Sequence, residues 1–117
     1  MKWTMALPAV VLAASVSAAS AQTVGGKYKA QGINPDKSTY SGTAEITRDG
    51  NNCHITWDVG SEWEGQCMLS GAAFAAWYRS GDTTGLLLYW LMPNGVLEGR
   101  WTLANGDTGR ESLIPTH

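Results

Sequence analysis

The chain has few of the residues on which catalysis and nucleic-acid binding depend. Only 15% of its 117 residues are charged, and eight basic against ten acidic side chains leave a net charge of −2. This balance argues against a nucleic acid as partner, which usually requires a basic face, and against electrostatic adhesion to anionic lipid. The two histidines, His54 and His117, are too few for a nucleophile–base–acid trio, and no phosphate-binding loop or metal-binding motif is present. We therefore predict no enzyme, no cofactor and no metal.

Long apolar runs are also scarce, and the clearest one lies at the N-terminus. Lys2 gives a positive start, Met5 to Ala14 is apolar, and Ala19-Ser20-Ala21 has the small-x-small pattern of a signal-peptidase site. The run is shorter than the roughly 20 apolar residues that span a bilayer, which disfavours the alternatives of an anchor or a buried helix. We predict a cleaved signal peptide over residues 1–21 and one domain over 22–117. The domain would work in the periplasm or outside the cell, without membrane insertion after cleavage.

Cysteine is limited to two residues, Cys53 and Cys67. Two cysteines in a small exported domain more often form a disulfide than remain free. A tight turn at Gly60 would make a hairpin in which Cys53 lies opposite Cys67. In that register Ile55, Trp57 and Trp63 share the face of the cysteines, because residues two apart on a strand point the same way. The polar residues share the other face: His54, Thr56, Asp58, Glu62, Glu64 and Gln66. We predict a Cys53–Cys67 disulfide.

Turn signals recur at a steady interval through the predicted domain. They are Asn34-Pro35-Asp36, Asp49-Gly50-Asn51, Gly60-Ser61, Ser70-Gly71, Gly81 to Gly85, Pro93-Asn94-Gly95 and Asn105-Gly106. Such spacing is typical of all-β sandwiches and barrels, and it predicts about eight short strands. The segments Ala72 to Arg79 and Leu86 to Met92 are expected to be strands, the second of them buried. A helix is the alternative for Ala72 to Arg79, because its alanines would suit one. Short connections favour an antiparallel up-and-down meander, closed into a small barrel. An open twisted sheet and a sandwich are the alternatives.

Tryptophan is abundant in the predicted domain, at positions 57, 63, 77, 90 and 101. A small barrel can be filled by a few such large side chains, so we expect most of them in the core. Trp63, beside the turn at Gly60, and Tyr40, near the first turn, are the candidates for exposed aromatic residues that bind a partner.

Turns, glycines and aromatic residues also carry a family resemblance over nearly the whole predicted domain. The segments are Gly32 to Asp36, Tyr40 to Ala44, Ile55 to Trp57, Gly95 to Trp101 and Gly109 to Pro115. They resemble a family of short exported bacterial proteins, many from alphaproteobacteria, that carry a fibronectin-binding label. The resemblance implies an extracellular binding role and supplies no catalytic residue. This chain has Lys37 where the family usually has glycine.

A shorter resemblance concerns the predicted hairpin. Thr56-Trp57 and Glu64 to Cys67 are similar to one hairpin of the avidin-like barrels, which are tryptophan-rich meanders of eight strands. This likeness implies architecture only. The carboxylates of Asp58, Glu62 and Glu64 are expected to be ordinary solvated groups, with a calcium site as the alternative.

The sequence favours a non-catalytic binding protein whose partner is a protein or a matrix component. The first alternative is a carrier of a small apolar ligand inside a lipocalin- or avidin-like barrel. The second is a structural or inhibitory envelope protein. A large internal cavity would favour the carrier, whereas a filled core and an exposed aromatic patch would favour the protein-binding role.

Overall fold

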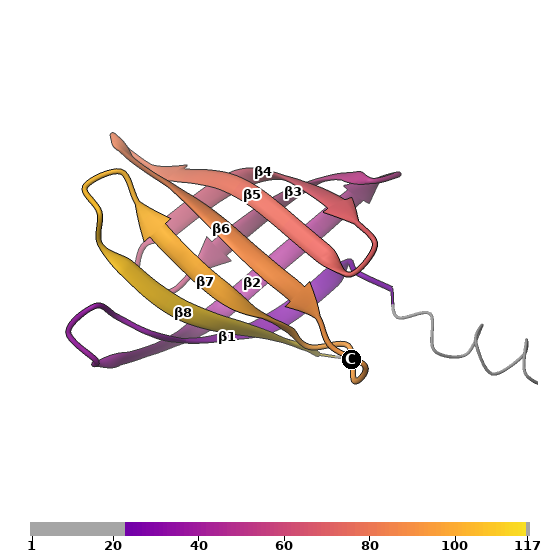
Figure 1. Ribbon diagram of the computed structural model, residues 1–117, viewed down its shortest axis with the longest axis horizontal. Helices are drawn as coiled ribbons and strands as arrows, with labels where there is room; N and C mark the ends of the chain where they lie inside the picture. The colour runs from indigo at the N-terminus through magenta and orange to yellow at the C-terminus, as the bar shows by residue number, and fades with distance from the viewer. Residues whose placement is uncertain (1–22, 117) are drawn as a thin grey trace, which may run out of the picture.

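The computed structural model describes residues 23–116, which form a single closed antiparallel barrel (Figure 1). The eight strands follow one another around the barrel in chain order: β1 (Gly26–Ile33), β2 (Thr39–Asp49), β3 (Asn52–Asp58), β4 (Glu62–Ser70), β5 (Ala73–Ser80), β6 (Thr83–Leu91), β7 (Leu97–Leu103) and β8 (Thr108–Pro115). Strand β8 pairs with β1, from Tyr28 opposite Pro115 to Ile33 opposite Arg110, and this pairing closes the ring. The predicted meander and its closure are confirmed, and the open-sheet and sandwich alternatives are wrong.

The signal peptide predicted over residues 1–21 lies outside the described residues, as does His117. Within residues 23–116, no helix has the length and apolar character needed to cross a membrane.

Six of the seven expected turns connect the strands where the sequence placed them. The exception is Gly81 to Gly85, where the turn is shorter than expected because β6 begins at Thr83 and includes Gly85. In the first turn Lys37 has a φ of 76°, in the left-handed region that favours glycine. The backbone there thus keeps a glycine-like conformation although the residue is a lysine.

The β3–β4 hairpin has the predicted register and the predicted faces. Cys53 lies opposite Cys67, and Trp57 lies opposite Trp63. The cysteines are disulfide-bonded, with Cα atoms 4.9 Å apart, and both face the lumen. Alternation along the two strands buries the apolar face and exposes the polar one.

The outer surface carries more apolar area than the sequence suggested. Leu86 to Met92 was expected to be buried, but the segment alternates, since Leu87 and Tyr89 face the lumen while their neighbours face outward. Most of the tryptophans were expected in the core, yet Trp77 and Trp90 are 48% and 53% exposed. We call the outward-facing side chains on β4 to β6 the outer apolar stripe. Its members are Met68, Trp77, Leu86, Leu88 and Trp90.

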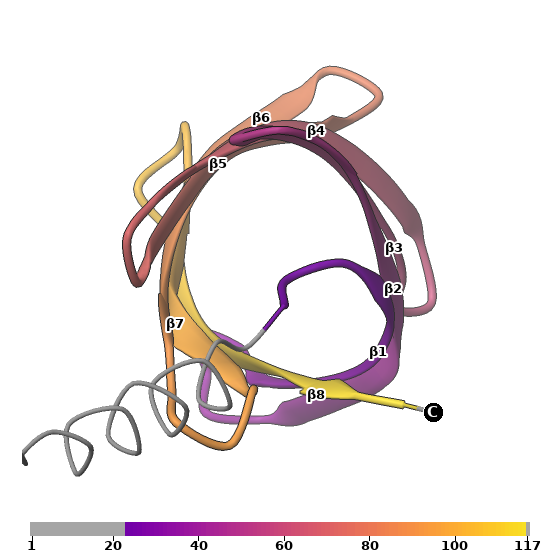
Figure 2. The same ribbon diagram turned by 90° about the vertical axis from the view of Figure 1, so that its right-hand side faces the viewer.

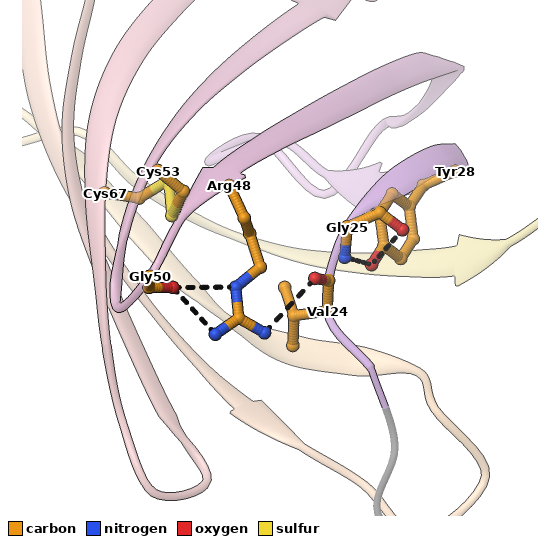
Figure 3. The surroundings of a disulfide bond; sticks show 7 residues. All are labelled: Val24, Gly25, Tyr28, Arg48, Gly50, Cys53 and Cys67. Atoms are coloured by element: carbon orange, nitrogen blue, oxygen red, sulfur yellow. Dashed lines mark hydrogen bonds between the residues drawn. A yellow bond between two sulfur atoms is a disulfide. The ribbon is translucent and has the colours of Figure 1, made fainter.

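One end of the barrel is covered in part by the segment that precedes β1, and we call it the closed end. Val24 is 2% exposed, and Figure 2 shows this segment turning inward across the ring of strands. Arg48 donates hydrogen bonds to the carbonyl of Gly50 at 2.8 and 3.0 Å and to that of Val24 at 3.5 Å, while the Tyr28 hydroxyl accepts one from the Gly25 amide (Figure 3). These contacts hold the segment in place next to the disulfide.

The half of the lumen next to this closed end is filled by side chains. They include Tyr28, Ile46, Cys53, Cys67, Phe74, Leu97 and Leu113, all less than 6% exposed. Phe74 packs on Tyr89, with ring centroids 5.3 Å apart. The packed half gives the barrel a hydrophobic core, so the side chains in the other half of the lumen are not needed to form one.

The disulfide leads to a first prediction. Replacing both cysteines by alanine should lower the free energy of unfolding by about 3 kcal/mol, because the bridge closes a short loop in the unfolded chain. Urea unfolding of the two forms measures this difference. Thiol titration of the unfolded, unreduced wild-type protein should find no free cysteine, and two reactive thiols per chain would contradict the assignment.

Candidate functional site

A carboxylate lies inside the barrel, at a position where the strand pattern calls for an apolar residue. Glu111 belongs to the inward-facing set of β8, between Gly109 and Leu113, and is only 7% exposed. Burial of a charged group is costly unless hydrogen bonds compensate it. The surroundings of Glu111 must therefore supply donors.

Three side chains from three other strands donate hydrogen bonds to this carboxylate. The Tyr40 hydroxyl donates to Oε2 at 2.7 Å, and the Trp57 indole Nε1 donates to Oε1 at 2.9 Å. The Tyr89 hydroxyl also donates to Oε1. Trp101 extends the network, because its indole Nε1 donates to the Tyr40 hydroxyl at 3.0 Å. The network thus joins β2, β3, β6, β7 and β8 across the lumen.

Burial shifts the titration of the network. Desolvation raises the pKa of Glu111, and the bonds from Tyr89, Tyr40 and Trp57 oppose that rise by favouring the charged form. Desolvation, and then the charge of Glu111, raise the pKa of Tyr40 and of Tyr89 well above the usual range of a tyrosine. The phenols accordingly stay protonated as donors, and the carboxylate is their acceptor.

Beside this network, the half of the lumen opposite the closed end contains a cavity of about 370 Å³. Its mouth lies among the β1–β2, β3–β4 and β7–β8 turns, and its inner wall includes Glu111 and Leu87. The lining residues are Asn34, Pro35, Tyr40, Trp57, Val59, Ser61, Trp63, Tyr78, Leu87, Trp101, Leu103, Asp107 and Glu111. Five of these thirteen residues are aromatic, so the wall is mainly apolar with a few polar groups.

Glycines on neighbouring strands let two of the aromatic rings lie flat over the backbone. Gly32 lies opposite Tyr40, and a Cβ atom there would be 2.1 Å from the tyrosine ring. Gly109 lies opposite Trp101, and a Cβ atom would be 2.2 Å from the indole and 2.4 Å from the Ile33 carbonyl oxygen. Any larger residue at either position would displace its ring. The glycines thereby set the positions of Tyr40 and Trp101 in the network.

Tyr78 joins two tryptophans into one aromatic wall of the cavity. Its ring centroid lies 5.4 Å from that of Trp57, at an interplanar angle of 55°, and 5.5 Å from that of Trp63, at 63°. Tilted rings at these distances are a favourable aromatic arrangement. The Trp63 indole is fixed at the rim by a 2.9 Å hydrogen bond to the Ser61 hydroxyl.

The structure brings both sequence-selected aromatic residues to this cavity. Tyr40 and Trp63 line it, and both are half-buried where the sequence predicted exposed aromatic residues. Their predicted part in binding stays a prediction. No functional role for Glu111 or Tyr78 followed from the sequence, and Trp101 was considered only as one of the tryptophans that could fill the core. A signal for Glu111 was available, since it is a charged residue on the alternating inward face of a strand.

Other polar clusters in the described part of the chain lie on the surface and form no buried site. His54 lies on the outer face, 3.5 Å from Glu64, and the same carboxylate is 3.5 Å from Arg79. These groups are about half exposed. The Arg79–Glu64 pair is an ordinary surface ion pair, which contributes little to stability, and the His54–Glu64 contact is an ion pair only when the imidazole is protonated. Among residues 23–116, no three His, Cys, Asp or Glu side chains gather as metal ligands.

Comparison with known proteins identifies the fold alone. No protein-family model matches the chain. No curated protein matches it either. Among solved structures, the redesigned β-barrel b11L5F_LGL has a TM-score of 0.70 at 13% identity, over 80% of this chain and 92% of its own. The redesigned barrel mFAP1, bound to DFHBI, has a TM-score of 0.69 at 13% identity, over 79% and 94%. A de novo designed fluorescence-activating β-barrel has a TM-score of 0.65 at 16% identity, over 79% and 93%.

The burial of Glu111 predicts a pH dependence of stability. Because folding raises the pKa of this carboxyl, the folded chain binds its proton more tightly than the unfolded chain does. Its contribution to stability is therefore complete below the ordinary pKa of 4.5 and is lost as the pH rises through the raised value. Glu111→Gln cannot titrate, so the wild type should lose stability relative to this variant between about pH 4 and about pH 8.

Urea unfolding of both proteins at the two pH values measures this change. Glu45→Gln, on the exposed outer face of β2, removes one carboxylate without touching the network and is the matched control. If the wild type instead gains stability relative to Glu111→Gln as the pH rises, the assigned direction of the pKa shift is wrong.

Proposed function

We propose that this protein is a non-catalytic binding protein that holds a small, mainly apolar ligand in the open half of its barrel. The observation that carries the proposal is the cavity of about 370 Å³ beside the Glu111 network. Ligand pockets typically measure roughly 300–1,000 Å³ and combine apolar walls with a few placed polar groups. We thus rank the carrier role above the protein-binding role that the sequence favoured.

The organisation of the barrel supports this proposal in two ways. The packed half and the disulfide stabilise the barrel. The residues around the cavity therefore do not have to pack against one another to form the core. The barrel mFAP1, which has the same fold, was solved with a small molecule bound. A disulfide is also typical of proteins outside the cytoplasm, where we propose that this one acts.

A neutral fluorescent dye tests the proposal. Prodan should bind saturably, with a blue shift of its emission, and should quench the tryptophans that line the cavity. Val59→Trp places a larger side chain at the half-buried rim and should weaken binding by about tenfold or more, equivalent to about 1.4 kcal/mol.

Thr56→Trp, on the exposed face of the adjoining strand β3, is the matched control and should bind Prodan like the wild type. Equal binding by all three proteins would place the dye outside the cavity. Absence of saturable binding to the wild type, by Prodan and by smaller aromatic probes alike, would contradict the proposal.

The outer apolar stripe favours a second candidate function, which is binding to a protein partner. Trp77 pairs with Leu86 across β5 and β6, and both are about half exposed or more. Large exposed apolar groups in a contiguous patch are typical of interaction surfaces. This candidate retains the extracellular protein partner that the family resemblance implies.

Immobilised fibronectin at physiological salt tests the second candidate. Saturable binding should weaken by about 2 kcal/mol or more in Trp77→Ser, because exposed tryptophans act as interface hot spots. Trp63→Ser alters the cavity rim instead and should leave fibronectin binding intact. If the wild-type protein shows no saturable binding to fibronectin, fibronectin is not its partner.

A further inference from the structure

The polar groups that line the cavity are unbalanced in charge. Its lining includes two carboxylates, Glu111 on the inner wall and Asp107 at the mouth. Among the lining residues within 23–116, none is a lysine, arginine or histidine. A low-dielectric cavity strengthens the field of the charges around it. An anionic ligand would therefore meet repulsion both on entry and when bound.

The aromatic wall, like the carboxylates, favours a positively charged ligand. Ring faces carry negative electrostatic potential and attract a cation within about 6 Å of the centroid, with tryptophan the strongest. The ring centroid of Tyr78 lies 5.4 Å from that of Trp57 and 5.5 Å from that of Trp63, and the plane of Tyr78 is inclined to both. All three rings line the cavity, so a cation bound there can lie against one or more of them.

Glu111 can still accept a hydrogen bond from such a ligand after it has accepted those from the protein. An ionised carboxylate offers about four acceptor positions. In the described part of the chain, Oε1 accepts from Trp57 and Tyr89, whereas Oε2 accepts from Tyr40 only. A position at Oε2 is therefore left for a donor, and the negative charge of the ionised form acts on the cavity at longer range.

We propose that the cavity selects a small organic cation, an ammonium group carried on an apolar or aromatic body. This inference rests on the proposed ligand-binding function and specifies its ligand class. The aromatic wall and Glu111 bind the ammonium group, and the remaining apolar lining, such as Leu87 and Leu103, contacts the body of the ligand. Asp107 at the mouth attracts the cation during entry.

Three probes of matched shape and different charge test this selection. They are phenyltrimethylammonium, its neutral isostere tert-butylbenzene, and the anion 2-methyl-2-phenylpropanoate. Titration of the wild-type protein, followed by tryptophan fluorescence, should show the cation binding about tenfold or more tighter than the neutral compound, and the anion binding weakest. Val59→Trp should weaken binding of the cation, which localises the site to the cavity.

Charge-removing variants then assign the selectivity. Glu111→Gln retains an acceptor for Trp57 and Tyr89 and supplies an amide that can donate to Tyr40, so the network can persist without the charge. It should reduce the preference for cation over neutral probe, whereas the control Glu45→Gln should not. Asp107 is exposed at the mouth, and its carboxylate accepts a 3.3 Å hydrogen bond from the Asn105 side-chain amide, which an asparagine oxygen can also accept. Asp107→Asn should therefore lower cation affinity without affecting the neutral probe.

The outcomes separate this inference from the proposed function. Equal or tighter binding of the neutral or anionic probe overturns cation selection and leaves the ligand-binding function standing. The same holds if Prodan binds in the cavity and phenyltrimethylammonium does not. If neither Prodan nor any of the three probes binds, both the proposed function and this inference fail.

Discussion

The burial of Glu111 is the interaction on which the arrangement of the barrel interior depends. A carboxylate with little access to water must receive hydrogen bonds from the protein, and Tyr40, Trp57 and Tyr89 provide them. Since these donors come from strands spread around the ring, the bonds cross the lumen. They fix where large rings lie, and they leave a cavity beside a charged wall instead of a uniformly packed core.

Two kinds of side-chain packing follow from this constraint. Near the closed end, aliphatic and aromatic groups fill the lumen around the disulfide, and Val24 covers them. Toward the open end, rings lie against strand glycines such as Gly32 and Gly109 and remain half-buried. The first region supplies stability, so the second can expose aromatic surface to a ligand without loss of the fold.

Much of the fold was predictable from the sequence, because turn residues and two-residue alternation are local properties. The register of Cys53 with Cys67 followed from the position of Gly60 and was confirmed. Alternation did not show that the side chains of Trp77 and Trp90 point outward, since β5 and β6 carry apolar residues on both of their faces. Such strands give no contrast between a buried and an exposed face.

The site was harder to predict, because it depends on contacts between residues far apart in the chain. Glu111 and Tyr40 are separated by 71 positions and become neighbours only when β8 pairs with β1. The sequence selected Tyr40 and Trp63 for their nearness to turns, and that nearness does place them at the open end. Tyr40 and Trp63 are half-buried because both occupy inward-facing positions of their strands and because the barrel closes around them.

Hydrogen exchange of the tryptophan indole N–H groups, followed by NMR, tests the central claim most directly. The Trp57 indole donates to a buried carboxylate, whereas Trp77 and Trp90 are about half exposed on the outer surface. We predict that the Trp57 indole proton persists long after those of Trp77 and Trp90 have exchanged. Exchange of Trp57 as fast as that of the two outer tryptophans would contradict the buried network around Glu111.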